Sequence, residues 1–284
     1  MTPRSAFRPH LWLTAVLVPY LALLSLTVVI GADTLWLVAM GDTIAGSRSI
    51  PDGIPFAAAD SSGWVNVPVL GELALAAVHL AGPVGLVVAQ LVVVGVTLLL
   101  TAVGARRLGA SSGAGAAAVL LVGLGALPSF GIVRAQLLSL VPFVVVLLVL
   151  RRQQRRPSHG IWLIVPLVAV WGNLHGAVLV GVAVIGCYLL FSRLRVEPVV
   201  AIAVGLATLA AVWVTPGLLA TGTYYVSVLS NEAAARGTDL WAAPSLGSPF
   251  DVLLVLAAVL LVGAALRRRL PLWEYVALAG LAVG

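Results

Sequence analysis

The first residue with chemical potential is Asp33, which follows an apolar run near the start of this 284-residue chain. A carboxylate at the boundary between lipid and water is partly desolvated, and desolvation raises its pKa so that it can accept a proton from a hydroxyl group. Asp33 is therefore a candidate general base. An acid in this position can also cap a helix or mark the membrane boundary, and both interpretations stay open here. We interpret Asp42 and Asp60 as ordinary loop acids.

The segment WVNVPVLGELALAAVHL, residues 64–80, predicts a helix that lies in the outer membrane interface. Glu72 and His79 are two helical turns apart, so they share one face of that helix. Such a face beside an acidic loop suits a substrate surface. The alternative is a polar stripe that water wets.

A third candidate is Arg134, which lies in GIVRAQLLSL at the outer end of a short apolar run. A charge near hydrocarbon is costly unless it has a partner. Because guanidinium binds phosphate oxygens in a bidentate fork, Arg134 is a candidate for holding a lipid-linked phosphate, with Gln136 as an uncharged donor. The alternative is that Arg134 reaches out to the lipid headgroups.

Asn173 and His175, in WGNLHG, form a further polar pair between apolar runs. The histidines and Cys187 show no ligand spacing, so we predict no metal site. Carboxylates alone could hold a divalent cation, but nothing in the sequence requires one, and we expect no cofactor.

The composition determines which elements must position these residues. The chain is 61% hydrophobic and only 9% charged, with a mean hydropathy of +1.13, whereas soluble domains carry about 25% charged residues. This excludes a soluble enzyme, a disordered chain and a disulfide scaffold. All basic residues are arginines in short runs between apolar segments, which is typical of membrane topology and unlike a nucleic-acid surface. We therefore predict an all-α polytopic membrane helix bundle.

About 20 apolar residues are needed to cross a bilayer, and we predict about eight or nine transmembrane helices. The last run is too short to span, so we expect residues 1–284 to be a single membrane domain and the N-terminal part of a longer protein. Outer loops are expected at about 32–81 and 216–249. The apolar runs lie near 11–31, 82–104, 113–130, 135–150, 161–173, 176–191, 198–215, 250–266 and 271–284.

The arginines predict the orientation of the bundle in the cell membrane. With the N-terminus in the cytoplasm, every arginine except Arg48, Arg134 and Arg236 falls on the cytoplasmic side, as the positive-inside rule requires. The acidic residues, apart from Glu197 and Glu274, fall outside. The candidate site residues therefore face the non-cytoplasmic side.

The apolar stretch at residues 161–191 could form either one helix or a hairpin of two. A single helix would be about 46 Å long, which exceeds the hydrocarbon thickness. A hairpin that turns at WGNLHG has arms of only about 20–24 Å, so its tip should lie below the outer membrane surface, shielded by protein. If Asn173 and His175 are there for catalysis, His175 should point to the cavity that receives Asp33 and Arg134. If they are structural, neighbouring backbone carbonyls should satisfy the His175 ring.

Several stretches resemble signatures of bacterial membrane proteins of the GT-C glycosyltransferase type. GADTLWLVAMG resembles D-x-D-L-W-W-H-L-x-x-G, IPDGIPF resembles I-P-x-x-D-P-F, and WVNVPVLGEL resembles W-V-N-H-E-W-L-x-E-L. Later, VRAQLLSL resembles A-R-P-Q-L-F-S, WGNLHGAVLVG resembles W-A-N-L-H-G, and LWAAPSLGSPF resembles E-W-x-x-P-S-x-x-S-P. The resemblance covers residues 30–250 in order and with similar spacing.

The chain also departs from this pattern. The matching positions keep Asp33, Trp64, Asn66, Glu72, Arg134, Gln136, Asn173 and His175. Polar family positions are replaced by Gly31, Leu37, Ile54, Val67-Pro68-Val69 and Leu240. These losses leave open a divergent, non-catalytic member of the family.

The resemblance implies a glycosyltransferase that passes a sugar from a polyprenyl-phosphate donor to an acceptor on the non-cytoplasmic face, with inversion. Asp33 would be the base, and Arg134 with His175 would hold the donor phosphate. Asn66 and Glu72 would orient the acceptor, and Gln136 and Asn173 would also bind substrate. The partners implied are the lipid-linked donor and membrane lipids, with no nucleic acid. The alternatives are a transporter or lipid flippase, and a non-catalytic scaffold.

Overall fold

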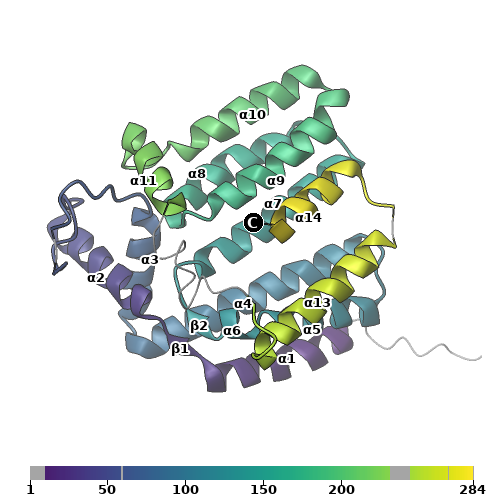
Figure 1. Cartoon of the computed structure of the whole chain (residues 1–284), viewed down its shortest axis with the longest axis horizontal. Helices are drawn as coiled ribbons and strands as arrows, with labels where there is room; N and C mark the ends of the chain where they lie inside the picture. The colour runs from purple at the N-terminus through teal and green to yellow at the C-terminus, as the bar shows by residue number, and fades with distance from the viewer. Residues whose placement is uncertain (1–9, 59, 231–243, 268, 284) are drawn as a thin grey trace, which may run out of the picture.

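The computed structural model describes residues 10–58, 60–230, 244–267 and 269–283, and nearly all of its regular structure is helical (Figure 1). The prediction of an all-α protein is confirmed. The α-helices are α1 (His10–Thr27), α2 (Ala32–Ser47), α3 (Val69–His79), α4 (Gly82–Arg107), α5 (Ser112–Gly125), α6 (Leu127–Phe130), α7 (Leu137–Arg155), α8 (Ile164–Leu174), α9 (Val178–Phe191), α10 (Pro198–Val212), α11 (Thr221–Leu229), α13 (Pro249–Leu266) and α14 (Leu272–Val283). The remaining elements are the 3₁₀ turns η1 (His159–Leu163), η2 (Arg193–Arg195) and η3 (Leu218–Ala220) and the strands β1 (Val29–Ile30) and β2 (Ile132–Val133).

Four helical stretches are long and apolar enough to cross a membrane, by length and composition: α4, α7, α9 continued to Arg195, and α13. The other apolar helices are shorter, among them α1, α5, α10 and α14. This agrees with a membrane protein. The count of eight or nine spans stays a prediction.

Helix α2 corrects the predicted outer loop at 32–81. Its polar residues and glycines suggested a loop, but its inward side chains recur at helical spacing and pack against α3. The contact is close, because a side chain at Gly41 would overlap the backbone carbonyl of Glu72. The buried positions are Thr34, Leu37, Val38, Met40, Gly41 and Ile44.

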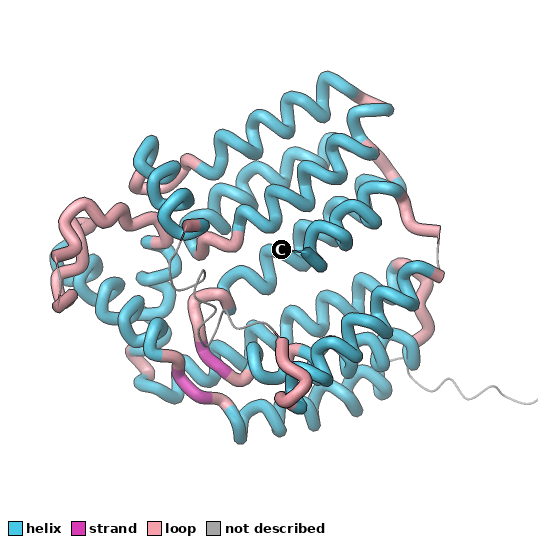
Figure 2. Tube along the Cα trace, in the orientation of Figure 1, coloured by secondary structure: helices cyan, strands magenta, loops and turns pink. Residues whose placement is uncertain are grey.

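The first apolar run does not continue as helix to residue 31. Helix α1 ends at Thr27, and the chain becomes extended in β1, which pairs in parallel with β2. Val29 lies opposite Ile132 and Ile30 opposite Val133. Figure 2 shows the two strands as short magenta segments. This pair joins parts of the chain about a hundred residues apart, immediately before α2 and just before α7.

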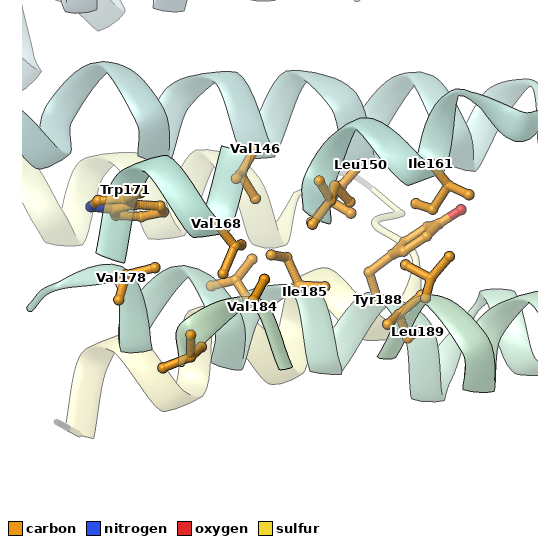
Figure 3. Packing of buried hydrophobic residues seen from close by; sticks show 14 of the residues in the cluster. Val146, Leu150, Ile161, Val168, Trp171, Val178, Val184, Ile185, Tyr188 and Leu189 are labelled. Atoms are coloured by element: carbon orange, nitrogen blue, oxygen red, sulfur yellow. The ribbon is translucent and has the colours of Figure 1, made fainter. Parts of the chain in front are cut away.

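Helices α8 and α9 form the predicted hairpin, and the turn lies at residues 175–177. The largest buried apolar cluster joins this hairpin to α7, α10 and α14 (Figure 3). Trp171 of α8 fits over Gly181 of α9, where a Cβ atom would overlap its indole ring. This packing makes the hairpin a rigid support for its tip.

Hydrogen bonds connect the helix ends at the end of the bundle opposite the hairpin tip. Gln154 of α7 accepts hydrogen bonds from Ser192 (2.5 Å) and from the indole of Trp273 (3.1 Å). Arg155 donates to the carbonyl oxygen of Arg107 at 3.0 Å. The ends of α4, α7 and α9 and the start of α14 therefore meet, and we call this the arginine end. The side of the membrane it faces stays a prediction.

Candidate functional site

The predicted site residues gather at the end of the bundle opposite the arginine end, which we call the site end. It comprises the β1–β2 pair with the starts of α2 and α7, helix α3, the α8–α9 turn and α11 (Figure 1). Helix α3 is pressed against the turn, because a side chain at Gly71 would overlap the carbonyl oxygen of Leu174. A Cβ atom at Gly71 would also lie 3.2 Å from the side chain of Leu138 in α7. Three distant segments are therefore in contact here.

The strand pair brings Asp33 and Arg134 to the same place. The backbone N–H of Gly31 donates to the carbonyl of Val133 at 3.1 Å, and the hydroxyl of Thr34 donates to the same oxygen at 2.6 Å. Since Arg134 follows Val133 and Asp33 is two residues beyond Gly31, their Cα atoms lie within about 15 Å of each other. This is compatible with a shared substrate.

Asp33 is exposed and lies in the first turn of α2, while Gly31 occupies the N-cap position. It is therefore not the helix cap, although a carboxylate there interacts favourably with the helix dipole. Its side chain makes no hydrogen bond to the described residues. The protein around Asp33 thus leaves its carboxylate accessible.

Arg134 lines a cavity of about 360 Å³ between α4, α6 and the start of α7. Its guanidinium makes no ion pair with the described part of the chain, and its buried Nε has no hydrogen-bond partner. Gln136, which is exposed, lies at the same cavity. Polar groups border the cavity together with the apolar side chains of Leu137 and Leu140, which suits an amphipathic ligand.

Glu72 and Asn66 form a buried pair, in which the amide of Asn66 donates to Oε2 of Glu72 at 2.6 Å. The other oxygen of each side chain, Oε1 of Glu72 and Oδ1 of Asn66, is buried without a partner. Burial raises the pKa of Glu72 to about 7, although the bond from Asn66 lowers it in part. Glu72 is only 1% exposed, so the interpretation of a stripe wetted by water is wrong for this residue, and the expected surface shared with His79 does not form.

His175 is tied into the α8–α9 turn. Its Nδ1 accepts the backbone N–H of Ala177 at 3.0 Å and lies 3.2 Å from the hydroxyl of Ser139, which accepts from the indole of Trp171 at 2.9 Å. Because Nδ1 accepts a hydrogen bond, the neutral ring carries its proton on Nε2. Burial lowers the pKa of His175 to about 4, so the ring is neutral at neutral pH. The ring is thus held by an N–H and a hydroxyl, and not by the carbonyls we expected.

Asn173 fastens the same turn to the segment after α10. Its amide donates to the carbonyl oxygens of Ala169 (2.8 Å) and Val214 (2.6 Å). Both amide hydrogens are therefore used, and only Oδ1 is left for a ligand. The geometry favours a positioning role for Asn173.

Aromatic side chains connect α2, the loop before α3 and α11. Trp36 packs edge-on against Phe56 and Trp64 at 6.3 Å each, Trp64 against Tyr224 at 6.4 Å, and Tyr224 against Tyr225 at 5.2 Å. We call these five residues the aromatic chain. Burial raises the pKa of Tyr224, and the charge of Glu72 raises it further. Rings of this kind suit the apolar faces of a sugar.

The sequence interpretation missed Gln90, Ser139 and Tyr224. Gln90 had a usable signal, because it is the one amide within the apolar run 82–104 and intramembrane polar residues are commonly functional. Ser139 and Tyr224 had none, since a serine or a tyrosine in an apolar segment is common. Leu240 and Arg236 lie outside the described residues.

In the described ranges, no three His, Cys, Asp or Glu side chains come together in a way that could hold a metal ion. Comparisons of the chain with protein-family models, with curated proteins and with solved structures found no match.

Proposed function

We propose that this protein is a membrane glycosyltransferase of the GT-C type, which moves a sugar from a polyprenyl-phosphate donor to an acceptor on the non-cytoplasmic face. The observation that carries the proposal is Arg134. Its guanidinium has no partner among the described residues, borders a cavity with polar and apolar walls, and lies close along the strand pair to an accessible carboxylate. A charge in this position is energetically unfavourable unless a bound ligand of opposite charge pairs with it. A lipid-linked phosphate supplies both the anion and the apolar chain.

The reaction follows from these two groups. The acceptor hydroxyl attacks the anomeric carbon, and its proton passes to the Asp33 carboxylate. The bond between that carbon and the phosphate oxygen breaks, and the charge of the departing polyprenyl phosphate is held by Arg134. Attack opposite the leaving group inverts the anomeric carbon.

The buried pair and the aromatic chain supply the surface for sugar groups. The free oxygens of Glu72 and Asn66 accept hydrogen bonds from hydroxyls once the site opens. Gln136 donates to the phosphate from the mouth of the cavity, and the Nε2–H of His175 is a second donor. Asn173 positions the turn.

The test uses the protein in lipid nanodiscs with undecaprenyl phosphate carrying radiolabelled mannose or glucose. Release of undecaprenyl phosphate and transfer of label to envelope glycan extracts are measured. Asp33→Asn should lower turnover by about 1,000-fold, because proton transfer contributes roughly 10²–10⁴. The matched control is Asp42→Asn, which changes an exposed acid of the same helix and should keep full activity.

The two alternatives have distinct outcomes, one in the nanodisc assay and one in cells. Movement of labelled lipid across the bilayer without sugar transfer would identify a transporter or flippase. For a scaffold, Asp33→Asn would restore the glycan profile of a deletion strain as well as the wild type does. Either result would overturn the glycosyltransferase proposal.

A further inference from the structure

Gln90 of α4 is a buried amide with half of its hydrogen-bonding capacity unused. It is 1% exposed, and its Nε2 donates to the carbonyl of Phe130 at 2.7 Å. Its Oε1 is buried and has no hydrogen-bond partner among the described residues. The bond to Phe130 fixes which way the amide faces, so Oε1 is held in place as an acceptor. A buried unpaired carbonyl costs about 1–3 kcal/mol, and so calls for an explanation.

The same cavity contains the opposite kind of unpaired group. Gln90 and Arg134 both line the cavity of about 360 Å³, and the Nε–H of Arg134 is a buried donor without a partner. The two groups do not bond to each other in the structure. A ligand that satisfies the hydrogen bonding of both groups must present an acceptor to Arg134 and a donor to Gln90. A bare phosphate ester presents only acceptors when it is fully ionised.

We infer that Gln90 is a specificity-determining residue that accepts a hydrogen bond from a hydroxyl of the sugar carried by the donor phosphate. This rests on the proposed function and extends it: the site recognises a glycosyl phosphodiester and discriminates against the sugar-free polyprenyl phosphate. Arg134 binds the part that the donor and the spent carrier share. Gln90 binds the part that the reaction removes, so the spent carrier is held less tightly and leaves.

The experiment measures the affinity of nanodisc-embedded protein for two probes at pH 7.5, farnesyl phosphate and farnesyl phosphoryl mannose. The variant Gln90→Met keeps the length of the side chain and removes the acceptor. This variant should weaken the affinity for the mannosyl probe by about 10-fold, the upper range for one neutral hydrogen bond. Its affinity for farnesyl phosphate should change by less than about twofold. Arg134→Gln should weaken the affinity for both probes by the same factor, at least about 10-fold.

The matched control is Gln153→Met. Gln153 is an equally buried glutamine at the arginine end, but its Nε2 donates to the hydroxyl of Ser158 and its Oε1 accepts the backbone N–H of Ser158, both at 2.9 Å. Its loss should leave both affinities unchanged.

A second measurement removes a hydroxyl from the ligand instead of the acceptor from the protein. In the wild-type protein, one of the monodeoxy forms of the mannosyl probe should bind about 10-fold more weakly than the parent, and this difference should vanish in Gln90→Met. If Gln90→Met weakens both probes equally, or neither, or if every deoxy form binds like the parent, a water molecule fills the site and the inference is wrong, while the Arg134 result still supports the function. If the wild type binds neither probe, both the inference and the proposed function fall.

Discussion

The two ends of this bundle differ in whether their charged side chains form ion pairs. At the arginine end, Arg151 pairs with Glu274, and Arg193 pairs with Glu197 at 2.9 Å, although Nε and Nη1 of Arg193 are buried without a hydrogen bond to the described residues. At the site end, Arg134 has no partner within the described residues, and Glu72 keeps one oxygen free. A buried charge without an ion-pair partner is more unfavourable than one that keeps its partner, so the ion pairs favour the stability of the arginine end. The site end sacrifices stability at positions where a ligand is expected.

The largest expected effect concerns Glu72 at the site end. Burial raises its pKa to about 7 from the ordinary 4.5. A carboxyl with a higher pKa in the folded protein adds stability that is fully present below about pH 4.5 and is lost as the pH rises through about 7. One pKa unit corresponds to about 1.4 kcal/mol. Relative to Glu72→Gln, the wild type should therefore lose about 3 kcal/mol of unfolding free energy between pH 4 and pH 8.

Unfolding by sodium dodecyl sulfate at a series of pH values measures this difference. Asp42→Asn, which changes an exposed acid, should follow the wild-type curve at every pH. If the unfolding free energies of the wild type and Glu72→Gln change with pH in the same way, the prediction is wrong. Glu72 would then no longer support the difference between the two ends.

Exchange of one arginine at each end should give opposite results. Arg134→Gln should lower sugar transfer by about 100-fold, because charge-assisted bonds contribute about 1.5–3 kcal/mol each. It should not lower stability, because it removes a buried donor that has no partner among the described residues. Arg151→Gln should leave transfer unchanged and lower stability by about 1 kcal/mol, since solvent screens its partly exposed pair with Glu274. Transfer and unfolding are measured on the same preparations. Equal effects of the two variants would break the comparison.

The smallest effect tests whether close backbone contact holds the site end together. Gly41→Ala should lower the unfolding free energy by about 2 kcal/mol, because the new methyl group overlaps the backbone of α3 at Glu72. Gly46→Ala in the same helix meets nothing within 4 Å and should stabilise the protein by about 0.5 kcal/mol. If both variants unfold alike, close backbone contact does not hold the site end.

Much of the candidate site follows from residue types alone. Arg134 was singled out because a lone arginine beside hydrocarbon needs a partner, and the structure leaves it without one among the described residues. The hairpin tip was located because helix length and arginine spacing leave one solution for residues 161–191. In contrast, Glu72 was expected at a surface and is buried. Burial depends on neighbours that are remote in sequence, so it could not be predicted.

The sequence by itself determined that the chain is helical. It also predicted that lipid is the solvent and that the arginines mark one side of the bundle. These properties depend on composition and on local spacing, which need no knowledge of distant contacts. Only the tertiary structure decided that β1 pairs with β2, that Gln90 and Arg134 share one cavity, and that Asn66 and Glu72 are enclosed. These are contacts between segments far apart in the chain, and many pairings satisfy the same hydrophobic pattern. Packing of backbones and side chains selects one of them.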